Sequence, residues 1–134
     1  MEQVLLFSNS RKMFEDTNAI TVGKYKLVWC TYDLLKKNQY PCSDIIIMHF
    51  DRKMTREGGT DPIIKVKCRF GHTIPILALI EEGSPQDIFS ILNVGAYDYL
   101  EKTDDMQKYK KKIDELALWN WYLKYSGQKN SRND

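Results

Sequence analysis

The amino-acid sequence predicts an α/β fold, a doubly wound five-stranded parallel sheet with helices on both faces. Five short apolar runs recur along the 134 residues, and the stretches between them have helical length. Three of the runs are continuously apolar, which is typical of parallel strands that are covered on both faces. Parallel neighbours need crossover connections, and right-handed crossovers place helices on both sides of the sheet.

Each apolar run is expected to form one strand. The first, third and fourth runs carry almost no polar side chains, and the second and fifth alternate more. The five expected strands cover residues 4–7, 25–30, 44–50, 74–80 and 97–100.

Local signals place three of the helices. Residues 31–38 have helical length, and residues 61–69 are predicted to be helical although their periodicity is ambiguous. Ser84 can cap a helix whose first residue is Pro85, a position that proline suits. Gly95 is expected to end that helix.

A last helix is expected to begin after Thr103-Asp104-Asp105, which repeats the pattern of a helix start. Apolar residues then recur at spacings of three and four, as on the buried face of an amphipathic helix. The expected buried stripe is Met106, Tyr109, Ile113, Leu116, Ala117 and Asn120.

Composition indicates one soluble globular domain. Apolar residues make up 43% of the chain, charged residues 28%, and the net charge is +2. No apolar run approaches the ~20 residues that span a bilayer, and no signal peptide is expected, so we expect a cytoplasmic protein without membrane contact. Three cysteines are expected to be reduced. Cys68 and His72 alone do not make a zinc site, and we expect neither metal nor cofactor.

In doubly wound folds the functional site lies outside the carboxyl ends of the central strands. Four stretches are expected to meet there, because each follows or ends a predicted strand. They are residues 8–10, 49–51, 80–82 and 102–103.

Three motifs resemble the receiver domain of bacterial two-component response regulators. They are GAYDYLEKT (95–103), IPILALI (74–80) and SDIIIM (43–48), and the resemblance covers roughly residues 3–118. It implies a flavodoxin-like, receiver-type fold and a role in phosphorelay signal transduction. It also implies that Lys102 is the retained lysine of the fifth strand and Tyr99 the aromatic switch position.

The positions that carry the family's chemistry differ from its pattern. Ser8 and Asn9 stand where the resemblance implies the acidic pair that binds Mg²⁺. His49 stands at the phosphoacceptor position, and Ile80 at the switch position that normally carries a hydroxyl. Mg²⁺ prefers carboxylate oxygens, and phosphoryl transfer depends on metal and lysine to neutralise charge. The sequence therefore predicts a degenerate receiver, or pseudo-receiver, without catalytic residues.

Three functional hypotheses follow. The first is a non-enzymatic signalling domain that acts through protein contacts, as in the regulatory part of a transcription regulator. The second is a working receiver that uses Asp51 as the phosphoacceptor. The third is a small ligand-binding or enzymatic flavodoxin-like domain, although we find no glycine-rich phosphate loop and no nucleophile–base pair. Asp51 is also the expected partner of the Lys102 ammonium, with Glu81 as the alternative.

The C-terminal helix is expected to carry the interaction surface. Trp119, Trp121 and Tyr122 fall off its buried stripe, and exposed aromatic residues often anchor protein partners. We expect residues 1–125 to form the receiver-like domain and 126–134 to form a polar tail or the start of a linker. Expected partners are a second copy or another protein, a histidine kinase, or an output domain that would supply any contact with DNA.

Overall fold

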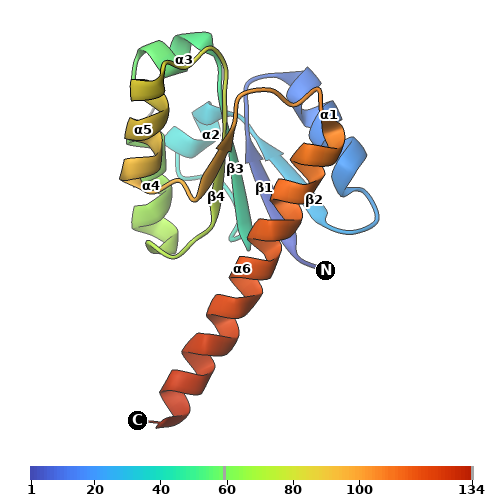
Figure 1. Ribbon diagram of the computed structural model, residues 1–134, viewed down its shortest axis with the longest axis vertical. Coiled ribbons are helices and arrows are strands. Elements are labelled where there is room, and N and C mark those ends of the chain that lie inside the picture. Colours follow the sequence, from blue (N-terminus) through green and yellow to red (C-terminus); the bar gives the residue numbers. More distant parts are fainter. Residues whose placement is uncertain (59, 134) are drawn as a thin grey trace.

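A five-stranded parallel sheet forms the centre of the protein, in the order β2-β1-β3-β4-β5 (Figure 1). The structure, a computed structural model, describes residues 1–58 and 60–133, and the side chains of 1–58 and 60–125. The predicted fold class is confirmed. The strands are β1 (Gln3–Phe7), β2 (Lys26–Cys30), β3 (Ile45–Phe50), β4 (Ile76–Ile80) and β5 (Asp98–Leu100).

Helices cover both faces of the sheet, as expected. One hydrophobic cluster joins the sheet to α2, α4 and α5, and the other joins the opposite face to α1 and α6. Along β3 the two clusters receive alternate side chains, which is the period-2 pattern of a strand buried on both faces. The helices are α1 (Arg11–Thr21), α2 (Tyr32–Lys36), α3 (Arg52–Arg56), α4 (Thr60–Phe70), α5 (Pro85–Val94) and α6 (Met106–Asn133).

The strand register determines which residues meet at the carboxyl edge of the sheet. Phe7 of β1 pairs with Met48 of β3, and Phe50 of β3 pairs with Ile80 of β4. The residues that immediately follow β1 and β4 therefore lie beside the last residues of β3. This is the edge where the sequence predicts a functional site.

The capping signals of α5 act as predicted. Ser84 Oγ accepts a hydrogen bond from the Asp87 backbone N–H, and Asp87 Oδ2 accepts one from the Ser84 N–H, which completes a capping box. Gly95 ends the helix with a φ of 132°, and a Cβ there would lie 2.1 Å from Lys67 Cε. The backbone conformation requires glycine at this position, whereas the flexible end of the Lys67 side chain could move away from a Cβ.

The sequence missed the short helix α3. Asp51 directly follows β3, and its Oδ1 accepts a hydrogen bond from the Met54 N–H at 2.9 Å, so Asp51 is the N-cap of α3. Alternation of strands and helices implied α1 without locating it. Ser10 begins α1, since its Oγ accepts a hydrogen bond from the Met13 N–H at 3.2 Å.

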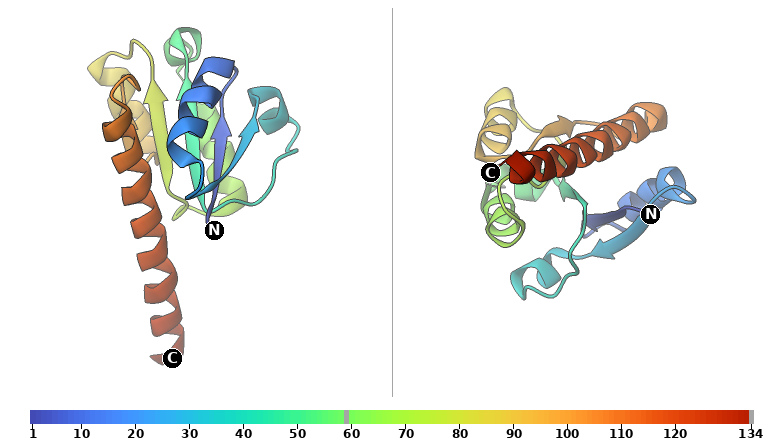
Figure 2. Two further views of the ribbon diagram at one scale, coloured as in Figure 1. Left: turned by 90° about the vertical axis from the view of Figure 1, so that its right-hand side faces the viewer. Right: turned by 90° about the horizontal axis from the view of Figure 1, so that it is seen from below.

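Helix α6 extends well beyond the sheet (Figures 1 and 2). The predicted buried stripe is confirmed at Tyr109, Ile113, Leu116 and Ala117, while Met106 and Asn120 are half-buried. The helix is continuous to Asn133, and the domain boundary placed at residue 125 stays a prediction. No described helix is long and apolar enough to cross a membrane.

Two carboxylates fasten α6 to the domain. Asp114 Oδ1 accepts hydrogen bonds from Tyr25 Oη at 2.6 Å and from Lys24 Nζ at 3.0 Å. Asp44 Oδ1 accepts from Lys124 Nζ at 3.0 Å. Partial burial would raise the pKa of both carboxyl groups, but hydrogen bonds outweigh it. At Asp44 they come from the Gln3 backbone N–H and Lys124, and at Asp114 from Tyr25 and Lys24, so that each pKa lies below its usual value. The two contacts thus favour the ionised carboxylates of the folded protein.

We expect α6 to be held less firmly at acidic pH. A carboxyl group whose pKa is lower in the folded state stabilises the fold above its unfolded pKa of about 4, and this stabilisation is lost as the pH falls through the folded pKa. Replacing Asp114→Asn should reduce the free energy of unfolding at pH 7 by about 1 kcal/mol, a value that allows for solvent screening. Urea unfolding should then show a smaller loss of stability between pH 5 and pH 2 than in the unchanged protein. An equal loss in both proteins would contradict the contribution of Asp114.

Candidate functional site

The imidazole of His49 joins three strands at the carboxyl edge of the sheet. His49 is the last residue but one of β3 and is only 5% exposed. Its Nδ1 lies 2.8 Å from Ser8 Oγ, directly after β1, and its Nε2 lies 3.0 Å from Glu81 Oε2, directly after β4. Both ring nitrogens are therefore hydrogen-bonded, each to a different neighbouring strand end.

The hydrogen-bond network favours one tautomer of His49. Ser8 Oγ accepts a hydrogen bond from the Ser10 backbone N–H at 3.0 Å, which leaves the hydroxyl proton of Ser8 free to be donated to His49 Nδ1. A ring whose Nδ1 accepts carries its proton on Nε2, which then donates to the Glu81 carboxylate. Every donor in this hydrogen-bond network consequently has an acceptor.

Aromatic side chains hold the backbone on either side of this network. Trp29 Nε1 donates to the Ser8 carbonyl, and Tyr32 Oη donates to the His49 carbonyl, each at 2.8 Å. Complete burial raises the pKa of Tyr32 well above its usual value, and the negative charge of Asp51 adds to this effect, so the hydroxyl remains a donor. The strand ends are thus tied together by side chains from β2 and α2.

Ser8, His49 and Glu81 are the residue types of an activated nucleophile, its base and an orienting acid. Nothing in the sequence pointed to the contact between Ser8 and His49, because it joins residues 41 positions apart. Ser8 is nevertheless fully buried, and its hydroxyl is hydrogen-bonded to both His49 and the Ser10 N–H. A hydroxyl without access to a substrate cannot act as a nucleophile, so the geometry supports a structural role for the three residues.

The other sequence-predicted positions lie around this network. Asn9 is exposed, and its Oδ1 accepts a hydrogen bond from the Tyr32 backbone N–H at 3.0 Å. Ile80 is buried on the opposite face of the sheet from His49, in the cluster that includes α4 and α5. Tyr99 is half-buried and packs against that same cluster.

The expected ion pair between Lys102 and Asp51 is wrong. Lys102 is exposed, and its ammonium lies within 4 Å of no carboxylate among the described side chains, Glu81 included. An exposed ammonium keeps its water and needs no partner. Asp51 caps α3 instead, and Glu81 is the partner of His49.

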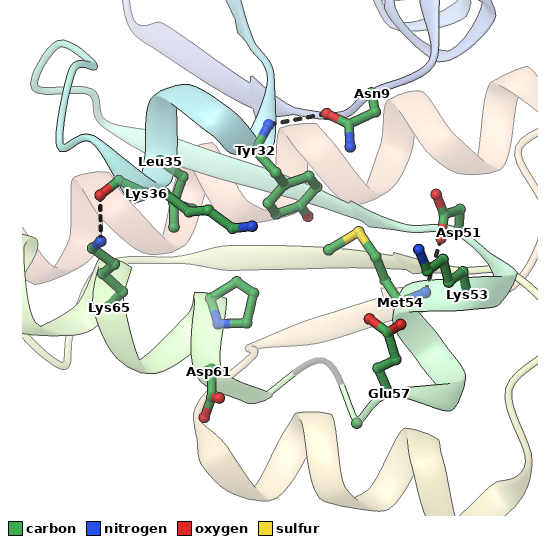
Figure 3. A pocket seen from close by; sticks show the side chains of 12 residues that line it. Asn9, Tyr32, Leu35, Lys36, Asp51, Lys53, Met54, Glu57, Asp61 and Lys65 are labelled. Atoms are coloured by element: carbon green, nitrogen blue, oxygen red, sulfur yellow. Dashed lines mark hydrogen bonds between the residues drawn. The ribbon is translucent and has the colours of Figure 1, made fainter.

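A cavity of about 500 Å³ is lined by His49, Glu81 and Lys102 among others, and two more cavities lie close by. One of about 250 Å³ lies beside His49 and is lined by Lys12, Asp51 and Glu81 among others. A second, of about 480 Å³, lies between α2 on one side and α3 and α4 on the other (Figure 3). Figure 3 shows charged side chains around apolar ones in this second cavity. Asn9 and Asp51 line the two smaller cavities.

The residues at the acidic-pair positions do not fit a Mg²⁺ ion. The Ser8 hydroxyl is buried and fully engaged, and the Asn9 carbonyl oxygen accepts from Tyr32. Within the part of the chain that the structure describes, no group of three or more His, Cys, Asp or Glu residues is placed to hold a metal ion. A hard cation that requires several oxygen ligands therefore finds no ready set of donors at these positions.

We expect Ser8 to contribute more to stability than Glu81. Ser8→Ala leaves His49 Nδ1 and the Ser10 N–H without a partner in a buried place, which should cost about 1–3 kcal/mol in the free energy of unfolding. Glu81→Gln keeps an acceptor for Nε2 at a half-exposed position and should cost less than about 0.5 kcal/mol. Urea unfolding of the two variants tests this order, and a neutral Ser8→Ala variant would contradict it.

Comparison with solved structures identifies the fold, whereas no family model and no curated protein matches the chain. The chain is similar to the chemotaxis response regulator CheY4 of Vibrio cholerae, with 22% identity, a TM-score of 0.71, and coverage of 87% of this chain and 98% of that one. A response regulator receiver domain protein from Clostridium thermocellum gives 15% identity, a TM-score of 0.72, and coverage of 92% and 99%.

A third similar structure is NtrX from Brucella abortus, with 12% identity and a TM-score of 0.78. The match covers 94% of this chain but only 29% of that one, so this chain corresponds to a fraction of the length of NtrX. The five-stranded parallel sheet, its strand order and these likenesses together show that the chain has the fold of response regulator receiver domains.

Proposed function

We propose that the protein is a pseudo-receiver, a signalling domain that acts through protein contacts and does not accept a phosphoryl group by the Mg²⁺-dependent route. The observation that carries this proposal is the state of His49. It occupies the phosphoacceptor position that the resemblance assigns, and both of its ring nitrogens are already hydrogen-bonded within the protein.

The neighbouring residues support the same proposal. Phosphoryl transfer depends on positioning and on charges that neutralise the phosphoryl oxygens. Ser8 and Asn9 offer no carboxylate for the metal, the Ser8 hydroxyl is buried and hydrogen-bonded, and Ile80 carries no hydroxyl for the phosphoryl group. Lys102 remains available to an anion, but a lysine alone does not replace the metal ion.

Asp51 is the second candidate phosphoacceptor. It lines the cavity beside His49, and only its Oδ1 is engaged by the cap of α3, so that the other carboxylate oxygen has no hydrogen-bond partner among the described residues. Phosphorylation of Asp51 would give the second hypothesis, a working receiver. The lack of a fitting set of metal ligands among the described residues weighs against it.

The proposed output is contact with another protein through α6. Receiver-type domains communicate with histidine kinases and output domains, and the length of NtrX beyond the matched part is consistent with an attached output region. A role as the regulatory part of a transcription regulator belongs to this proposal. In that arrangement any contact with DNA is made by the output domain.

We expect no phosphoryl adduct when the protein is incubated with acetyl phosphate and Mg²⁺, because the metal ligands and the acceptor carboxylate of the usual route are replaced. Intact-mass spectrometry measures the result, and Asp51→Asn is the matched control. A stoichiometric adduct that is present in the unchanged protein and absent from Asp51→Asn would contradict the pseudo-receiver and favour the working receiver.

We also expect Mg²⁺ to leave the melting temperature unchanged relative to a control of equal ionic strength. A ligand stabilises the folded state by RT ln(1 + [L]/Kd), so a site with millimolar or weaker affinity gives a small shift even at about 10 mM Mg²⁺. The triple variant Ser8→Asp, Asn9→Asp and His49→Asp restores the carboxylates and should show a clear rise. A rise in the unchanged protein would show that this chain binds Mg²⁺ through other residues.

A further inference from the structure

The outer face of α6 carries an apolar stripe that the domain does not cover. We define the outer stripe as four residues spaced three or four positions apart along the helix. Their exposed fractions are 67% for Leu118, 52% for Trp121, 55% for Tyr122 and 56% for Tyr125. The ring centroids of Trp121 and Tyr125 lie 4.3 Å apart, so the two side chains already form one surface.

Contacts on both flanks prevent α6 from rolling this stripe inward. On one flank Lys112 Nζ donates to Asp98 Oδ2 of β5 at 2.6 Å, and Trp119 stacks on Tyr97 with ring centroids 5.7 Å apart. On the other flank Asp114 is bonded to Tyr25 and Lys24. With the buried stripe packed on the sheet, the outer stripe therefore remains in water.

We propose that the outer stripe binds a second copy of this chain in an antiparallel arrangement, with the two-fold axis passing between Trp121 and Tyr122. This inference rests on the proposed function, because it names the partner of the α6 surface. An axis at this point places Leu118 opposite Tyr125 of the second copy, and Trp121 opposite its Tyr122. The spacing of the four residues is symmetric about the axis, so the stripe is complementary to itself.

The amount of exposed apolar surface fits a second copy that binds reversibly. Aromatic side chains present about 150–250 Å² each, so the half-exposed residues of the outer stripe offer about 400 Å² per copy. Two copies would then bury about 800 Å², below the roughly 1,200–2,000 Å² of stable interfaces. We therefore expect a reversible dimer with a Kd on the order of 100 µM, which dissociates on dilution.

The residues that flank the stripe favour the antiparallel over the parallel arrangement. Glu115 and Lys111 are exposed and lie one and two turns before Leu118 on the same side of α6. A parallel pair would place Glu115 beside Glu115 and Lys111 beside Lys111 across the axis, and like charges at such positions are unfavourable. The antiparallel pair avoids both contacts and packs a smaller side chain, Leu118, against a larger one.

Sedimentation equilibrium tests the dimer. The unchanged protein should associate reversibly, and Trp121→Ala should weaken association at least about tenfold because it removes a central contact. Phe89→Ala is the matched control, since Phe89 is 68% exposed on α5, away from the stripe. A monomer at all concentrations up to about 1 mM, or equal weakening by both variants, would overturn the proposal. Unchanged circular dichroism spectra and melting temperatures show that the variants remain folded.

Disulfide cross-linking tests the orientation. The exposed Cys42 and Cys68 are first replaced by serine, while buried Cys30 is kept. Leu118→Cys and Tyr125→Cys proteins are then oxidised separately and as a mixture. The antiparallel pair predicts a mixed 118–125 disulfide in the mixture and little cross-linking in either separate sample. Efficient 118–118 or 125–125 bonds would overturn the antiparallel arrangement.

The two proposals can fail independently of each other. A monomer that takes up no phosphoryl group would overturn the dimer and leave the pseudo-receiver intact. A dimer that is phosphorylated on Asp51 would do the reverse. The mass and sedimentation measurements share no readout, so one result cannot stand in for the other.

Discussion

The arrangement of the carboxyl edge of the sheet depends on the two hydrogen bonds of the His49 imidazole. Parallel strands bring their ends to one edge, and here the ends of β1, β3 and β4 are joined by one side chain with two hydrogen bonds. The hydrogen bonds of the network are complete within the protein. Ser8 Oγ accepts one from the Ser10 N–H, and the Glu81 carboxylate accepts one from the His49 ring. An edge of three acidic side chains in these places would need cations to offset their repulsion, whereas this edge needs none.

The proposed signalling role draws on two features, the hydrogen-bonded edge of the sheet and the exposed face of α6. In the proposed pseudo-receiver the His49 network takes up no phosphoryl group, and a signal would enter or leave through another surface. Helix α6 offers that surface, since it is fastened on both flanks and yet presents Leu118, Trp121, Tyr122 and Tyr125 to water. The proposals on the site and on the helix therefore describe two consequences of one arrangement.

Much of the fold could be predicted from the sequence, because its signals are local. Continuous apolar runs gave the buried strands, and Ser84, Pro85 and Gly95 gave both ends of α5. The helix α3 was not predicted, because a single residue, Asp51, marks its start. The sequence analysis had expected Asp51 to form an ion pair with Lys102 instead. The Ser8–His49–Glu81 network also escaped, since its residues are 41 and 32 positions apart and only the strand register brings them together.

Long-range ¹H–¹⁵N correlation NMR of the histidine rings tests the central claim most directly. The chain has two histidines, and the exposed His72 is an internal control for buried His49. At pH 8 the account predicts that His49 is a single tautomer with its proton on Nε2 and an unprotonated Nδ1. His72 should show the averaged signals of exchanging tautomers. A His49 ring that exchanges like His72, or carries its proton on Nδ1, would contradict the network that joins the three strands.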